Sequence, residues 1–291
     1  MNTYVWLVRR EFWENRAIWI CPALIGAALT CAALFGRVDV AALSSPEQNR
    51  SMAGMAFFAF GAIFYGVMSI YSTWYLLDCL YADRKDRSVL FWKSLPISDT
   101  ATVLSKVFVG LIAIPIVYFI AADLSTLLMA FIIALRSRSS FGGALWQPDL
   151  WLQLQALWLY MIISTAVWYL PLAGWLMLVS AWAKRAVMLW CILPPLAAVL
   201  AERLFLGSHA IASLLRNRIL GYGQAAYDLS DRGLWVTTTF GHDDAITAPS
   251  SVWRLLKPIG FFSAPATWIG VLVGAALIYG AIQLRLRRTE L

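Results

Sequence analysis

Charged residues are scarce in this sequence: Asp, Glu, Lys and Arg make up only 13% of its 291 residues, against about 25% in a typical soluble domain. Hydrophobic residues reach 61%, a share that a soluble domain of this length could not hide from water. This composition excludes a disordered chain, a collagen, a disulfide scaffold and an ordinary soluble enzyme. The class that remains is a polytopic membrane protein.

Cysteine and histidine, the usual ligands of zinc, are also few. The four cysteines form no CxxC pair and lie in or beside apolar runs, which is typical of small buried residues; they are Cys21, Cys31, Cys79 and Cys191. Asp243 and Asp244 follow His242, but adjacent carboxylates in a loop with nearby glycine and proline are more typical of a turn than of a metal site. The sequence predicts neither a disulfide framework nor a bound metal.

Signature motifs of nucleotide binding and hydrolysis are absent as well. The chain has no GxxxxGK[ST], no HExxH, no GxSxG and no SxxK, which are the patterns of the phosphate-binding loop and of common hydrolases. We therefore expect no enzyme activity and no cofactor bound by this chain itself.

Long apolar runs are what the sequence has instead. A bilayer core about 30 Å thick needs about 20 apolar residues per helix. Six stretches meet this requirement, at roughly Ala17 to Phe35, Gly54 to Leu77, Val107 to Leu135, Leu154 to Trp182, Val187 to Phe205 and Phe262 to Leu284. The first is longer than the apolar run of a cleaved signal peptide, so we expect it to be retained.

Basic residues are distributed unequally between the segments that join these spans. Thirteen lie on one side (Arg9, Arg10, Arg16, Arg84, Lys85, Arg87, Lys93, Lys106, Lys184, Arg185, Arg285, Arg287 and Arg288), and the short loops of the other side hold four (Arg37, Arg50, Arg136 and Arg138). Basic loops face the cytoplasm, so we predict an all-α polytopic membrane protein of six transmembrane helices with both termini cytoplasmic. The net charge of +7 then fits anionic lipid rather than nucleic acid.

The N-terminal segment, residues 1–16, combines aromatic, apolar and charged side chains at helical spacing. Val5, Val8 and Phe12 fall on one face, with Trp6 and Trp13 nearby. A short helix of this composition is typical of the membrane interface. We expect it to lie along the inner leaflet before the chain turns into the first span.

The cytoplasmic loop over residues 81–100 is the second polar segment. Asp83 and Arg87 are spaced to pair along a helix, Pro96 ends that helix, and Ser98 and Asp99 can cap the next one. The result is a short helix with a charged end and an aromatic end between two spans. From composition alone it fits equally well a surface that docks a soluble partner and a helix that lies on lipid.

Two features inside the spans also stand out. Asp123 is an acid within an apolar run, and its expected neighbours are Ser125, Thr126 and Gln155. An unpaired acid at the bilayer centre is costly, so Asp123 and Gln155 either line a polar translocation pathway or Asp123 reaches water at the outer headgroups. The GxxxG pair of Gly270 and Gly274 allows close helix packing, within the chain or across a dimer.

Two stretches carry a resemblance to a known family. The N-terminal "RREFWENR" before the first span, and "DRKDRSVLFWKSLPISDTATVLSK" between spans two and three, resemble the permease (transmembrane) subunit of a type-2 ABC exporter. Ser94, Leu95, Pro96, Ser98 and Lys106 match that family's loop pattern. The layout of six spans with a larger outer segment between spans five and six is similar to the family over the whole chain.

The resemblance implies a mechanism and partners. Two permease subunits, here a homodimer, pair in a bacterial inner membrane, and two separate ABC ATPase subunits bind ATP and Mg below them. The loop is then the coupling helix that contacts the ATPase, with Asp83, Arg84, Lys85, Asp86, Arg87, Leu90, Phe91, Trp92, Ser94, Leu95 and Pro96 as its contact residues. The outer segment, residues 202–258, is implied to fold back toward the membrane over Glu202 to Leu215, although it is long and polar for that role.

Two other classes stay open at this stage. A membrane-embedded enzyme that acts on lipid-linked substrates would need a cluster of His, Asp and Arg on one membrane face, for which the candidates are His209, His242, Asp243 and Arg254. A structural or assembly protein without transport activity is the third class. An ATPase that co-purifies with the chain would favour the exporter.

Overall fold

A computed structural model describes residues 3–36, 46–85, 98–136, 141–228, 235–240, 244–249 and 252–287 of the chain. Its helices are α1 (Thr3–Glu14), α2 (Ala17–Phe35), α3 (Pro46–Lys85), α5 (Asp99–Phe108), α6 (Ile114–Arg136), α7 (Phe141–Ala144), α8 (Pro148–Trp168), α9 (Leu170–Trp182), α10 (Val187–Ala201), α11 (Ala210–Leu220), α12 (Tyr222–Ala226), α13 (Val252–Leu255), α14 (Pro258–Ser263) and α15 (Pro265–Arg287). Two π-helical turns, η1 (Val109–Ala113) and η2 (Glu202–Leu206), continue α5 and α10, and the strands β1 (Trp235–Phe240) and β2 (Asp244–Pro249) form an antiparallel hairpin.

The described residues contain six helices that are long and apolar enough to cross a membrane, at Ala17–Phe35, Met52–Lys85, Asp99–Arg136, Pro148–Trp168, Val187–Leu206 and Pro265–Arg287. The prediction of an all-α polytopic membrane protein is thereby confirmed. The first helix has the predicted bounds. The second and third extend further than predicted at the ends that the loop joins, because residues predicted for that loop form helical turns of both.

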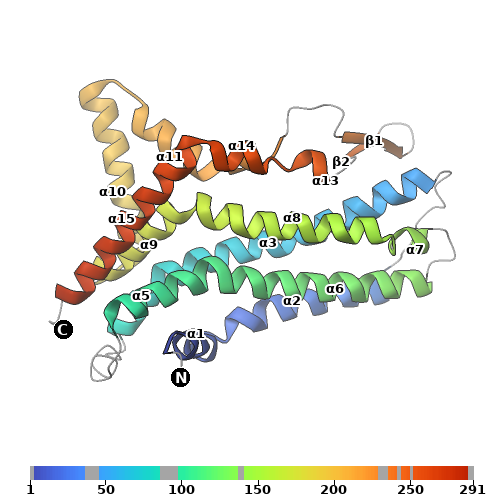
Figure 1. Cartoon of the computed structure of the whole chain (residues 1–291), viewed down its shortest axis with the longest axis horizontal. Coiled ribbons are helices and arrows are strands. Elements are labelled where there is room, and N and C mark those ends of the chain that lie inside the picture. Colours follow the sequence, from blue (N-terminus) through green and yellow to red (C-terminus); the bar gives the residue numbers. More distant parts are fainter. Residues whose placement is uncertain are drawn as a thin grey trace.

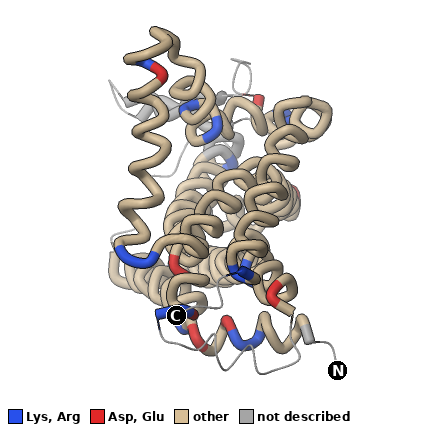
Figure 2. The backbone as a smooth tube through the Cα atoms, turned by 90° about the vertical axis from the view of Figure 1, so that its left-hand side faces the viewer, with Lys and Arg blue, Asp and Glu red and all other residues tan. Residues whose placement is uncertain are grey.

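The long helices form two groups (Figure 1). Helices α2, α3, α6 and α8 run side by side, whereas α10 and α15 are inclined to them and α1 lies crosswise. Both termini and α5 lie toward one end of this bundle, which we call the inner end; α7 and the hairpin lie toward the opposite, outer end. In the end-on view of Figure 2, acidic and basic residues alternate near the two termini, while the long helices carry few charges.

The predicted fourth span, Leu154 to Trp182, is wrong as a single helix: α8 ends at Trp168 and α9 begins at Leu170. Tyr169, between them, has φ −88° and ψ 6°, outside the helical region. Pro171 in the first turn of α9 has no N–H and so cannot continue the hydrogen-bond ladder of α8. The break lets α9 turn away from α8 and pack against α15.

Glycine allows α9 and α15 to approach closely. A Cβ atom at Gly174 of α9 would lie 2.7 Å from the carbonyl oxygen of Gly274 in α15, and a Cβ at Gly274 would lie 2.8 Å from the carbonyl oxygen of Leu170. Backbone atoms cannot move aside as a side chain can, so both positions need glycine. Gly274 of the GxxxG pair is therefore used for packing within the chain.

The third span contains the turn η1 between α5 and α6. Pro115 follows this turn, and a proline removes one backbone donor from the helix interior. A π-helical turn accommodates the missing bond while the helix continues. Gly110 within η1 lies against α3, since a Cβ atom there would be 2.5 Å from a terminal methyl carbon of Leu76. The turn therefore also sets the close approach of α3 to this span.

Candidate functional site

A network of buried ion pairs joins four helices at the inner end. Its members are Arg10 and Glu11 of α1, Asp83 of α3, Asp99 and Lys106 of α5, and Arg285 of α15. Glu11 and Lys106 are each only 1% exposed. Arg10, Lys106 and Arg285 contribute three positive charges, and Glu11, Asp83 and Asp99 contribute three negative charges. The charges of these six residues balance, which lowers the cost of burying them; Glu14, which is 46% exposed, also pairs with Arg10 at 3.0 Å.

Lys106 is the centre of this network. Its Nζ lies 2.9 Å from Oε1 of Glu11 and 3.3 Å from Oδ1 of Asp83. The hydroxyl of Tyr75 donates to the other oxygen of Glu11 at 2.7 Å. Both carboxylates therefore have charged or hydrogen-bonding partners, which offsets part of the cost of removing them from water.

Arg285 joins the two ends of the loop between α3 and α5. Its Nη1 lies 3.1 Å from Oδ2 of Asp83, at the end of α3, and its Nε lies 2.8 Å from Oδ1 of Asp99, at the start of α5. Ser98 caps α5 as predicted, because its Oγ accepts a hydrogen bond from the N–H of Ala101 at 3.1 Å. The last helix of the chain thus fixes both ends of the loop between α3 and α5.

Helix α9 adds a further attachment to the end of α3. The Oγ of Ser180 accepts hydrogen bonds from the backbone N–H groups of Leu80 and Tyr81, at 3.1 and 3.0 Å. Arg84 donates to the carbonyl oxygens of Ser180 and Ala183. These bonds satisfy carbonyl groups at the C-terminal end of α9 that have no partner inside the helix. The end of α3 is therefore held by α1, α5, α9 and α15 together.

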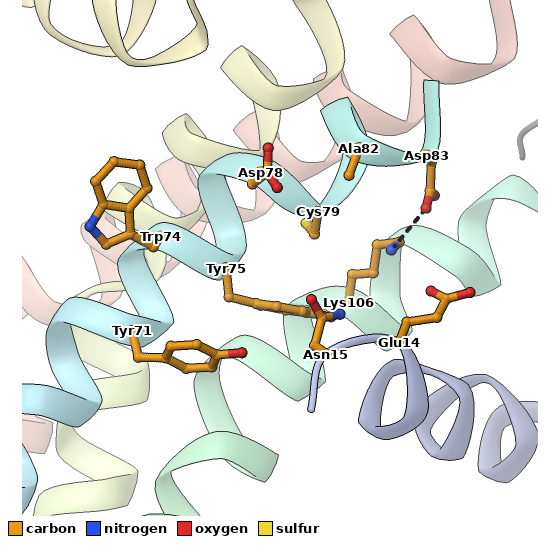
Figure 3. Close-up of a pocket in the computed structure, with 10 residues that line it drawn as sticks. All are labelled: Glu14, Asn15, Tyr71, Trp74, Tyr75, Asp78, Cys79, Ala82, Asp83 and Lys106. Carbon is orange, nitrogen blue, oxygen red and sulfur yellow. Dashed lines mark ion pairs between the residues drawn. The ribbon is translucent and has the colours of Figure 1, made fainter. Parts of the chain in front are cut away.

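A cavity of about 670 Å³ lies beside the network. Ten residues line it: Glu14, Asn15, Tyr71, Trp74, Tyr75, Asp78, Cys79, Ala82, Asp83 and Lys106. In Figure 3, Lys106 extends toward Asp83, and Tyr71 and Tyr75 lie between α3 and the end of α1. Trp74 and Asp78 project together from the same stretch of α3 and line the same cavity. This volume is within the usual range of small-molecule sites.

The structure describes only part of the predicted coupling residues. Asp83 and Arg84 are held by contacts within the chain, and Lys85 at the end of α3 is exposed. The remaining predicted contact residues, Asp86, Arg87, Leu90, Phe91, Trp92, Ser94, Leu95 and Pro96, lie outside the described residues. Asp83 is therefore held by the ion-pair network, and Arg84 is held by the carbonyl oxygens of Ser180 and Ala183.

The interfacial helix α1 uses a different face from the one predicted. Val5 is 61% exposed, whereas Leu7 and Glu11 are buried. Val8 and Phe12 pack against the core in half-buried positions. The difference arises because Glu11 and Arg10 are drawn into the ion-pair network, and α1 must turn that face toward the protein.

The exposed side of α1 carries its two tryptophans. Trp6 and Trp13 are 44% and 62% exposed, and the guanidinium of Arg9 lies 5.1 and 4.7 Å from their ring centroids. An aromatic and basic surface of this kind suits the headgroup region of a membrane.

Asp123 and Gln155 are brought together as expected. Nε2 of Gln155 donates to Oδ2 of Asp123 at 2.9 Å, and Asp123 is half-buried. The expected contacts with Ser125 and Thr126 are absent in the described residues, because both hydroxyls donate to carbonyl oxygens one turn earlier in α6. The pair of Asp123 and Gln155 therefore connects α6 to α8.

The outer segment contains a hydrogen-bonded cluster that the sequence did not indicate. The hydroxyl of Tyr222 lies 2.8 Å from Oγ of Ser164 and 3.0 Å from Oγ1 of Thr165, and the hydroxyl of Tyr160 donates to the carbonyl of Ala226 at 2.8 Å. Burial raises the pKa of Tyr227, beside Tyr222, above its usual range. These contacts hold α12 against α8.

The fold of the outer segment begins with a carboxylate cap. Glu202 accepts hydrogen bonds from the N–H groups of Ala210 and Ile211 at 2.7 and 2.8 Å, and from Oγ of Ser208 at 2.5 Å. A carboxylate at these free N–H groups fixes the turn from η2 into α11. The chain thus reverses direction between η2 and α11, and the return of Glu202 to Leu215 toward the membrane stays a prediction.

The sequence did not identify Arg10, Lys106 and Arg285 as partners of Asp83, or Glu11 as a partner of Lys106. The sequence around Glu11 and Lys106 does indicate that each needs a partner of opposite charge. Glu11 lies on a helix that also bears apolar residues, and Lys106 stands between Val103 and Val107, which are both buried. A charged residue within an apolar pattern requires a partner of opposite sign. Which acid pairs with which base depends on the tertiary structure, and the spacing of these residues along the chain does not predict the pairing.

In comparisons with known proteins, no family model, no curated protein and no solved structure matches the chain. Among the residues that the structure describes, no group of three His, Cys, Asp or Glu side chains could hold a metal ion. His209, a candidate for the enzyme interpretation, is exposed at the start of α11, and His242 and Asp243 lie outside the described residues.

Proposed function

We propose that this chain is the permease subunit of an ATP-driven ABC exporter of the type-2 class in a bacterial inner membrane. It pairs with a second copy of itself and with two separate ATPase subunits, which bind ATP and Mg. The observation that carries the proposal is the anchoring of the loop between α3 and α5. Asp83 precedes the loop, Asp99 follows it, and Arg285 contacts both.

Such anchoring is what a force-transmitting loop requires. Coupling between distant sites is carried by packed side chains, ion-pair networks and rigid helices. A push on this loop would reach α3 through Asp83, α5 and α6 through Asp99, and α15 through Arg285. A loop that only lay on lipid would need no buried attachment at both ends.

The arrangement of the remaining elements supports the same proposal. Both termini lie toward the inner end, α1 lies crosswise there, and the segment between the fifth and sixth spans contains the short helices α11 to α14. These features agree with the layout of the family that the sequence resembles. The substrate passes through the membrane part that this chain provides, and ATP hydrolysis takes place on the partner.

Co-purification tests the proposal directly. The tagged chain is isolated from its own membranes in a mild detergent, and the co-eluting proteins are identified and assayed for ATP hydrolysis. We expect an ABC ATPase in stoichiometric amount. We also expect F91A or W92A to reduce its binding by about 2 kcal/mol, the threshold for an interface hot spot.

The matched control is W146A, because Trp146 is an exposed tryptophan that follows α7 at the outer end. It should leave ATPase binding unchanged. An intact, folded chain that binds no ATPase would refute the proposal. Full ATPase binding by both F91A and W92A would refute the assignment of these two residues as the contact surface.

A further inference from the structure

The cavity at the inner end has an aromatic wall. Tyr71, Trp74 and Tyr75 come from two successive turns of α3 and line it together. The ring faces of tryptophan and tyrosine attract cations, and groups of such rings are the usual binding site of quaternary ammonium compounds. Trp74 is 52% exposed, so the cavity opens to the side of α3.

The charge of the cavity is negative. Its lining contains Glu14, Asp78, Asp83 and Lys106, which are three acids and one base. The ammonium group of Lys106 is paired with Glu11 and Asp83, and Glu14 is paired with Arg10. Within the described part of the chain, Asp78 has no ion-pair or hydrogen-bond partner. The carboxylate that remains for a ligand is therefore that of Asp78.

Asp78 and Trp74 are placed to act on the same group. They lie one turn apart on α3 and project from the same side of the helix (Figure 3). Residues spaced by four on a helix are neighbours on its surface. One cation can therefore meet the carboxylate and the indole face together. This local negative charge contrasts with the inner side of the chain, where lysine and arginine predominate.

The position of the cavity suits a ligand with a polar head and an apolar tail. It lies between α3 and the end of α1, whose exposed Trp6, Trp13 and Arg9 fit the headgroup region. An ammonium head in the cavity would therefore be level with the headgroups, and an alkyl chain could extend from the open side into the bilayer.

We infer that this cavity binds an amphipathic organic cation, that is, an ammonium group attached to an alkyl chain. The ammonium contacts Asp78 and the ring of Trp74, and Tyr71 and Tyr75 form the rest of the aromatic wall. The ammonium belongs either to a free amphiphile or to the headgroup of a membrane lipid such as phosphatidylethanolamine. Binding requires only this chain, so its test is independent of the proposed ATPase partner.

The test measures binding of radiolabelled octyltrimethylammonium to the purified full-length chain in dodecyl maltoside, by scintillation proximity. We expect saturable binding that unlabelled octyltrimethylammonium displaces and that octyl glucoside or octanoate, at equal concentration, does not. Binding should weaken as salt is added, because Asp78 is exposed and its charge is screened. Equal displacement by octyl glucoside would overturn the inference, since the cavity would then bind any alkyl chain.

Two variants and two matched controls locate the site. D78N removes the charge at nearly constant volume, and W74L removes the aromatic ring but keeps an apolar side chain. Each should weaken binding about fivefold, as expected for a partly exposed cation–π contact or ion pair. D149N and W19L are the controls, because Asp149 is an exposed acid on α8 and Trp19 is also 52% exposed. Unchanged binding in both D78N and W74L, or an equal loss in the controls, would overturn the inference.

Phosphatidylethanolamine distinguishes the two sources of the ammonium group. If the lipid occupies the cavity, adding it to the micelles should displace the probe from the wild-type chain, while phosphatidylglycerol should not. If phosphatidylethanolamine has no effect, the ligand is a free amphiphile. A chain that binds no probe but still co-purifies with an ATPase would refute this inference and leave the proposed function standing.

Discussion

Lys106 and Glu11 form an ion pair of 2.9 Å in which each side chain is only 2% exposed. The two residues come from α5 and α1, so the pair attaches the crosswise N-terminal helix to the start of the third span. A buried charge whose partner is removed is strongly destabilising. The docking of α1 therefore depends on a residue 95 positions away along the chain.

Removal of the ammonium group of Lys106 should lower the stability of the fold. K106M keeps the length and most of the volume of the side chain, but it leaves Glu11 and Asp83 without their central positive partner. We expect a loss of about 3 kcal/mol of stability, at the lower end for a broken buried pair, because Arg10 still contacts both acids. The measurement is thermal unfolding of the purified protein in detergent.

The control for this prediction is K85M, since Lys85 is exposed at the end of α3. It should change stability by less than about 0.5 kcal/mol. The double variant K106M/E11Q should recover part of the loss, because both members of the buried pair are then neutral. A stability of K106M equal to that of K85M would contradict the buried position of Lys106.

The sequence was sufficient for the spans because each depends on local composition. Ala17–Phe35 was predicted to the residue, and it is bounded by Arg16 on one side and by Gly36 and Arg37 on the other. The fourth span was not predicted correctly, although Pro171 was visible. A proline inside an apolar run kinks the helix, breaks it or is tolerated in it, according to which residues pack around it. Here the close packing of α9 against α15 stabilises the broken helix.

Less of the candidate site could be predicted from the sequence. Asp83 was identified, because it begins a charged turn at the end of a span, but its partners were expected on another protein. Arg285 is 202 positions further along the chain, and no spacing rule links such distant residues. The pair of Asp123 and Gln155 could be predicted, since Asp123 is a charged residue within an apolar run and Gln155 is one of few polar residues at the start of the next predicted span.

Close packing of α9 on α15 should make Gly174 intolerant of any side chain. A Cβ at this position would lie 2.7 Å from a backbone oxygen of Gly274, so G174A forces the two helices apart. We expect a loss of about 1–3 kcal/mol, as for other overpacked cores, measured by chemical or thermal unfolding.

The matched control is G66A in α3, where a Cβ would meet nothing within 4 Å. Alanine favours the helix more than glycine does, so G66A should leave stability unchanged or increase it. Equal destabilisation by the two substitutions would show that α9 and α15 do not approach as closely as described.

Labelling of introduced cysteines with a membrane-impermeant maleimide should show which end of the bundle faces the outside of the cell. After replacement of the four native cysteines, K85C and R287C should be labelled only in broken cells, and R50C and S139C should be labelled in intact cells. The expectation follows from the excess of basic residues in the inner segments. Labelling of R287C in intact cells would reverse the predicted orientation of the last helix.

Arg285 and Arg287 offer the sharpest comparison in the chain, because both belong to the last turn of α15 but only Arg285 is buried. R285M removes the contacts to Asp83 and Asp99, which are 6% and 15% exposed. Lys106 and Arg10 still compensate Asp83, so we expect a loss of about 2 kcal/mol, less than for a fully broken buried pair. R287M should cost almost nothing.

The functional consequence of R285M should appear at the loop. With both of its ends less firmly held, backbone amide exchange should become faster at the end of α3 and the start of α5, while α2 and α8 keep their protection. If the loop couples an ATPase to the membrane helices, the R285M complex should still assemble but hydrolyse ATP without productive export. Exchange that rises equally throughout the bundle would show that Arg285 stabilises the fold as a whole and has no particular role in holding the loop.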